Sequence, residues 1–187
     1  MSQFEYITVL TSLVVAVGVS QLLSGWGRLY VGRKTAPPYA LQVAASALLL
    51  LALVQSIWGY WGFRNVSWDF GRFLIVLAPL LPLVGATYIV LPRTEGASAP
   101  SQSPRDHYFE VHRAIFLLLA AWIALGTIAE LALVEPELHL GQAVRFVGVV
   151  LLIALGFTTR PELHWSGLLV LAALQIAFVR IVTPILG

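Results

Sequence analysis

Residues 35–63 read TAPPYALQVAASALLLLALVQSIWGYWGF and carry no charged side chain between Lys34 and Arg64. A helix needs about 20 mainly apolar residues to cross the hydrocarbon core of a bilayer. The stretch exceeds that length, and Pro37 and Pro38 stand where proline suits the opening of a helix. It therefore predicts a membrane-spanning helix over about 38–63.

The composition of the whole chain agrees with this prediction. Of 187 residues, 59% are apolar and only 11% are charged, whereas a soluble domain carries about 25% charged residues. A soluble chain this apolar could not cover its surface with polar groups. We therefore expect a single integral membrane domain over residues 1–187.

Five further apolar runs predict helices over about 6–30, 73–92, 104–134, 140–159 and 161–186. The fold class expected is all-α, a polytopic transmembrane bundle of about six helices. The run at 140–159 is the shortest, because its charge-free part spans only residues 146–159. That length also fits a re-entrant segment. We favour a spanning helix, because Arg145 lies within snorkelling reach of the end of the run.

The linkers support this division of the chain. Residues 93–103 read RTEGASAPSQS, a small-residue and proline-rich stretch that predicts a flexible loop between two halves of three helices. Residues 103–106 (SPRD) resemble a capping box with proline at the first helical position. Residues 159–162 (TRPE) repeat that pattern before the last helix.

The basic residues predict the orientation. With the N-terminus outside, seven of them fall on the cytoplasmic side and four on the other, counted from the six predicted runs. Because basic residues concentrate on the cytoplasmic side, we expect both termini outside. Trp58 and Trp61 then lie near the outer surface, as part of an aromatic belt. The alternative is a stacking platform for a ligand, since the two rings share one helix face.

The opening of the chain carries a resemblance. Residues 4–28 hold a Phe-Glu-Tyr start followed by a glycine and glutamine pattern ahead of an arginine, at Phe4, Glu5, Tyr6, Gly18, Gln21, Gly25 and Arg28. This resembles a set of small uncharacterised bacterial multi-pass membrane proteins. The resemblance covers the first helix and, more loosely, the tryptophan-rich end of the second. It implies a bacterial inner (cytoplasmic) membrane and no known activity.

Two helices carry stripes of small and polar residues. In the first helix, Gly18, Gln21, Gly25 and Arg28 recur at three- and four-residue steps, and Arg145, Gly148, Leu152 and Gly156 do so in the fifth. Small residues let helices approach closely, and a buried amide can bond across the contact. A packing seam is the favoured interpretation, and a polar lining that touches a solute is the alternative.

Three charges fall inside predicted helices. Glu130, Arg145 and Arg180 lie at similar depth in the outer leaflet, because each stands a few residues from an outer helix end. Charges at that depth usually pair or face water. We predict a buried charge cluster in which Glu130 pairs with Arg145 and Arg180 lies close by. The alternative is an anion or proton site.

The histidines and prolines suggest weaker hypotheses. His107 and His112, with Asp106 and Glu110, could form a metal or protonation site, but we favour a solvated helix entrance, since no metal-motif spacing is present. His139 and His164 also stand near predicted helix ends. Pro79 and Pro82 interrupt the third helix and should free carbonyls near Ile75 and Ala78. Their effect is either a kink in packing or a broken helix that lines a cavity.

The motifs that the sequence lacks limit the classes of function that we expect. The sequence has no nucleophile motif, no phosphate-binding glycine loop and no cysteine, so we expect no enzyme, no catalytic or metal residues and no cofactor. Its scattered basic residues give no reason to expect nucleic acid. The favoured function is a structural or accessory subunit of a membrane complex. The alternative is a small oligomeric channel or transporter with a buried Glu/Arg site. Expected partners are membrane lipids and other membrane protein subunits or copies of this chain.

Overall fold

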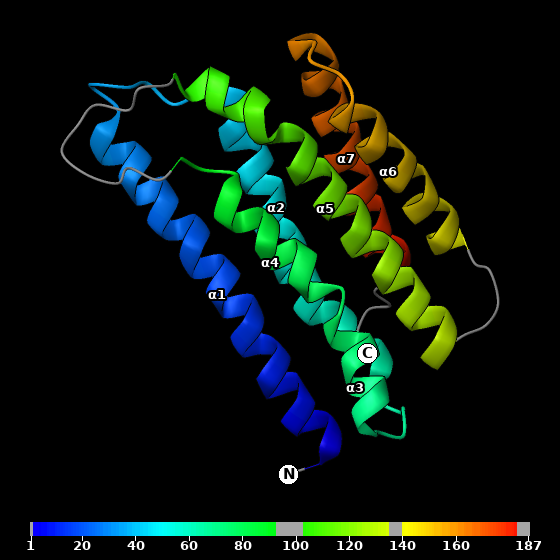
Figure 1. The fold of residues 1–187 in the computed structure, drawn as a ribbon. Helices are drawn as coiled ribbons and strands as arrows, with labels where there is room; N and C mark the ends of the chain where they lie inside the picture. Colours follow the sequence, from blue (N-terminus) through cyan, green and yellow to red (C-terminus); the bar gives the residue numbers. More distant parts are fainter. Residues whose placement is uncertain (1, 93–102, 135–139, 183–187) are drawn as a thin grey trace.

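The fold is a bundle of antiparallel helices (Figure 1). The computed structural model describes residues 2–92, 103–134 and 140–182. Its elements in chain order are α1 (Gln3–Gly32), α2 (Ala40–Gly59), the 3₁₀ turn η1 (Tyr60–Phe63), α3 (Phe70–Leu77), α4 (Leu80–Ile89), α5 (Pro104–Leu133), α6 (Leu140–Gly156) and α7 (Pro161–Val182). The all-α prediction is confirmed for the described residues. The predicted loop over 93–103 lies outside them except for Ser103.

Five helical stretches of the described chain are long and apolar enough to cross a membrane. They are α1, α2 with η1, α3 with α4, α5, and residues 161–180 of α7. The sixth, α6, is shorter, and its 17 residues span about 26 Å at 1.5 Å per residue. Arg145 of α6 pairs with Glu130 near the end of α5, and Gly156 lies against Arg113 in the first half of α5. Helix α6 thus packs without a break along the part of α5 between Arg113 and Glu130.

Local capping chemistry sets several helix ends. Ser2 and Glu5 form a complete capping box, so α1 begins at Gln3 rather than near residue 6. Ser103 accepts a hydrogen bond from the Asp106 amide at 3.2 Å with proline at the first helical position, as the sequence predicted. Helix α2 begins at Ala40 after Tyr39, two residues after the start predicted at about 38.

The third span is two helices rather than one. Asp69 caps α3, so the span begins at Phe70 and not at 73, and it breaks between Leu77 and Leu80, at Pro79. A proline lacks the amide proton that would bond one turn back, and its ring clashes there. The hydroxyl of Tyr60 instead donates to the Val76 carbonyl at 3.1 Å, so this break is partly capped from η1.

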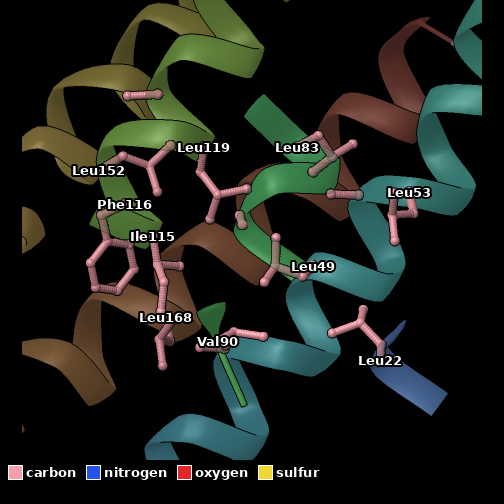
Figure 2. Close-up of a cluster of buried hydrophobic side chains, with 14 of the residues drawn as sticks. Leu22, Leu49, Leu53, Leu83, Val90, Ile115, Phe116, Leu119, Leu152 and Leu168 are labelled. Atoms are coloured by element: carbon pink, nitrogen blue, oxygen red, sulfur yellow. The ribbon is translucent and has the colours of Figure 1, made fainter. Parts of the chain in front are cut away.

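The core joins both halves of the chain. Figure 2 shows Leu22, Leu49, Leu53 and Leu83 meeting on one side, while Phe116, Leu119, Leu152 and Leu168 meet on the other. Helix α4 contacts α1, α2 and α5, so it links the two groups. Between α2, α5, α6 and α7 the packing leaves a space, which holds the candidate site.

Candidate functional site

A cavity of about 740 Å³ opens among α2, η1, α5, α6 and α7. It also touches the break in the third span, at Val76, Pro79 and Leu80, so the broken helix lines a cavity, as one of the two sequence hypotheses proposed. Sites for small ligands commonly measure about 300–1,000 Å³. The cavity therefore has the volume of a ligand site.

One face of α5 forms a wall of the cavity. It presents Phe116, Leu119, Ile123, Gly126 and Glu130 at three- and four-residue steps. Phe116 stands fourteen residues before Glu130, which is about 21 Å along a helix axis. The wall is thus an apolar stripe with one carboxylate near its end.

An ion pair between Glu130 and Arg145 forms part of that wall. Arg145 Nη1 donates a hydrogen bond to Glu130 Oε2. The Arg145 side chain is 20% exposed and the Glu130 side chain is 23% exposed. The guanidinium also lies over the ring of Phe178 in α7, 4.6 Å from its centroid. The predicted pairing of Glu130 with Arg145 is confirmed, and the arginine bridges three helices.

Arg180 does not belong to this group. The side chain of Arg180 is exposed and does not line the cavity. The nearby residues of α7 that do line it are Gln175, Phe178 and Val179. Successive residues turn by about 100° around a helix, so Arg180 lies on nearly the opposite side of α7 from Phe178. The prediction of a three-member cluster is therefore wrong for Arg180, because matched depth does not fix the side of the helix.

Two glutamines in the cavity wall have unpaired buried atoms. Oε1 of Gln55 in α2 and Nε2 of Gln175 in α7 have no hydrogen-bond partner among the described residues. Buried polar atoms without a partner are costly. Sequence reasoning missed both residues, although an amide inside an apolar run is itself a sign of a buried polar contact.

Aromatic residues stand where α2 passes into η1. Trp58 and Trp61 are 52% and 51% exposed, and both line the cavity. Trp61 also meets the ring of Phe4 edge-on, with centroids 6.2 Å apart. The exposure of the two rings is compatible with an aromatic belt, and their position in the cavity wall is compatible with a stacking surface. Both hypotheses for this pair therefore remain open. We call this end of the bundle the η1 end.

The stripe on α1 is a packing surface at its glycines. A Cβ added at Gly18 would lie 3.0 Å from Leu53 Cδ2, and one at Gly25 would overlap Leu91 Cδ1. Arg28 is exposed, Gln21 is partly exposed, and no residue of α1 lines the cavity. The stripe on α6 differs, because Arg145, Gly148 and Leu152 line the cavity while Gly156 packs against α5.

Two histidines are buried at the opposite end of the bundle. The solvated entrance expected there is wrong for His112, which is 7% exposed, and His164 is completely buried. Tyr108 Oη lies 2.8 Å from His164 Nδ1, and His164 Nε2 lies 2.9 Å from the Thr158 carbonyl. A carbonyl can only accept, so Nε2 carries the proton and the Tyr108 hydroxyl donates to Nδ1.

The rings around these groups form a layer beneath the cavity. We call Tyr108, His112 and His164 the buried histidine cluster; the His112 and His164 centroids lie 5.4 Å apart, and His164 is equally close to Phe116. His112 Nδ1 bonds the Phe109 carbonyl at 2.6 Å. Across the described chain, no three His, Asp or Glu residues form a group that could hold a metal ion. The metal hypothesis for the start of α5 is therefore wrong.

No protein-family model, curated protein or solved structure matches this chain.

Proposed function

We propose that this chain is a non-enzymatic membrane protein that binds an amphipathic molecule in the cavity among α2, α5, α6 and α7. This is the accessory class of function, in the specific form of a binding subunit. We also propose that the chain associates with other membrane protein subunits or with copies of itself.

The observation that carries the proposal is a partly exposed ion pair in a mostly apolar wall, which Arg64 also lines at the η1 end. Glu130 and Arg145 each expose about a fifth of their side chain and both line the cavity. Charges inside a membrane usually face a bundle interior or water, because lipid exposure is costly. A molecule with one polar end and one apolar part would satisfy both the pair and the leucine-rich wall.

The transport alternative rests on the same charges. A carrier would have to pass its solute beyond Phe116, where the buried histidine cluster fills the bundle. Binding requires no such opening, so it is the simpler function for this geometry. Flux of a bound amphipathic molecule through proteoliposomes, rather than retention alone, would favour the transport alternative.

The proposed location is a bacterial inner membrane with both termini outside. The distribution of basic residues supports the orientation, and the resemblance of residues 4–28 supports the membrane. In this orientation the η1 end of the cavity faces the outer leaflet.

Filling the cavity tests the proposal. Gly126 lines the cavity, and a Cβ added there would meet nothing within 4 Å. Gly126→Leu should therefore occupy space meant for the bound molecule without disturbing the helix contacts. We expect the purified wild type to retain lipid in native mass spectrometry, and the variant to retain about tenfold less, the ratio that corresponds to 1.4 kcal/mol.

Gly27→Leu is the matched control. Gly27 also has open space around its Cβ position, but it stands on α1 away from the cavity. It should retain lipid as the wild type does. Equal retention by Gly126→Leu and Gly27→Leu would show that the cavity is not the binding site, and no retention by the wild type would also contradict the proposal.

A further inference from the structure

A guanidinium without a counter-charge stands at the η1 end of the cavity. Arg64 lines the cavity and is exposed. Its Nη1 donates to the Trp61 carbonyl at 3.2 Å, and the guanidinium lies over the Trp61 ring, 5.5 Å from the centroid. Among the described residues, no carboxylate forms an ion pair with it. The edge of the guanidinium therefore keeps N–H groups from which an anion can accept hydrogen bonds.

The second guanidinium of the lining also has unused donors. Arginine carries five N–H donors, and Arg145 gives one of them to Glu130 Oε2. No other described residue accepts a hydrogen bond from Arg145, and its side chain is 20% exposed. An anion can therefore accept a hydrogen bond from Arg145 while the ion pair with Glu130 stays intact.

Together these groups give the lining a surplus positive charge. Among the described residues that line the cavity, the charged side chains are Arg64, Glu130 and Arg145. Two guanidinium groups and one carboxylate leave one positive charge uncompensated. Charges attract more strongly beside apolar walls than in bulk water, because the effective dielectric constant is lower there. A polar end with one negative charge would therefore balance the lining.

The rest of the cavity fits the apolar part of a lipid. Trp58 and Trp61 line the cavity and are half-exposed, and tryptophan is enriched at the level of the lipid headgroups. From Glu130 the α5 wall continues about 21 Å to Phe116, whereas one leaflet contributes about 15 Å of hydrocarbon. A lipid with its headgroup at the η1 end thus has an apolar wall long enough for an acyl chain.

We propose, resting on the function proposed above, that the cavity selects an anionic phospholipid, one whose headgroup carries a single net negative charge on its phosphate. The phosphate oxygens accept hydrogen bonds from Arg64 and Arg145, because the planar fork of a guanidinium matches the geometry of a phosphate. Glu130 holds Arg145 at the wall. The apolar stripe of α5 between Glu130 and Phe116 holds an acyl chain.

Headgroup competition tests the selection. Protein in nanodiscs made of equal amounts of phosphatidylglycerol, which is anionic, and phosphatidylcholine, which is zwitterionic, is transferred to detergent. The retained lipids are quantified by native mass spectrometry, and we expect the wild type to retain phosphatidylglycerol in excess. Arg64→Gln removes the uncompensated charge, so the ratio of phosphatidylglycerol to phosphatidylcholine should fall about tenfold. Arg64→Glu should lower the ratio further.

Arg180→Gln is the matched control. Arg180 is also an exposed arginine, and it stands two residues after Phe178, but it does not line the cavity. Its substitution removes the same charge from the protein, so the lipid ratio should stay at the wild-type value. A fall equal to that of Arg64→Gln would assign the preference to the general charge of the bundle and overturn the selection.

The outcomes separate the selection from binding itself. Equal retention of both lipids by the wild type, or an unchanged ratio in Arg64→Gln, would overturn the selection. A retained fatty acid in place of a phospholipid would overturn it too. Each of these results leaves binding intact as long as Gly126→Leu retains less total lipid than Gly27→Leu; loss of that difference overturns the proposed function instead.

Discussion

The Tyr108 hydroxyl donates a hydrogen bond to Nδ1 of His164, and both side chains are completely buried. The bond joins α5 to α7, which are far apart in sequence. Removal of the hydroxyl would leave the imidazole nitrogen unpaired in the interior.

Tyr108→Phe should therefore destabilise the protein. A buried group that loses its partner costs about 1–3 kcal/mol, so thermal unfolding in detergent should occur at a lower temperature. Tyr30→Phe is the control, because Tyr30 is 66% exposed and the loss of its hydroxyl should leave the transition unchanged. Equal melting temperatures for the two variants would show that the Tyr108–His164 bond adds no stability.

The Glu130–Arg145 pair should show coupling. Breaking a buried pair costs about 3–5 kcal/mol in soluble proteins, because one charge is left alone; in lipid, snorkelling lowers that cost. Glu130→Gln should lower the unfolding temperature in detergent, and Glu130→Gln with Arg145→Gln should recover part of the loss.

The control for this cycle is Arg180→Gln. Arg180 is exposed and lies outside the cavity lining, so combining its substitution with Glu130→Gln should give additive changes. Additivity between Glu130→Gln and Arg145→Gln would instead mean that the pair is not energetically coupled.

Close packing at Gly25 should not tolerate a side chain. A Cβ there would overlap Leu91 Cδ1, so Gly25→Val should cost about 1–3 kcal/mol through overpacking. Gly27→Val on the same helix meets open space and should have little effect. Adding Leu91→Ala to Gly25→Val should restore part of the lost stability. If Leu91→Ala raised the stability of Gly27→Val by the same amount, the effect would not come from the Gly25–Leu91 contact.

Reporter fusions should establish the topology. Fusions at Ser2 and Gly187 should report outside, and fusions at Ser101 and Thr159 should report inside. The Thr159 fusion decides the role of α6, because it lies just after that helix. If α6 were re-entrant, Thr159 would report on the side opposite to Ser101.

The helices were predictable, because hydropathy over about 20 residues and capping motifs are local properties. The start of α5 at Pro104 and the Glu130–Arg145 pair followed from this local information and a short connection between α5 and α6. The side of each helix that faces the bundle was harder to predict, since lipid-facing and buried residues here are equally apolar.

That difficulty explains why some residues were predicted wrongly or missed. Arg180 has the right depth but the wrong side of α7, and His164 is buried because the chain after α6 brings Thr158 against its ring. Gln55 and Gln175 become notable only when α2 and α7 are brought around one cavity. Each of these depends on contacts between distant parts of the chain.

The short α6 also affects the surrounding membrane. Its 17 residues cover about 26 Å, whereas an average bilayer has about 30 Å of hydrocarbon. Hydrophobic mismatch of this kind is relieved by thinning of the bilayer or by oligomerisation, at fractions of a kcal/mol per Å. The protein should therefore thin the membrane locally on the α6 side and partition into thinner bilayers, which gives it a preference for membrane thickness.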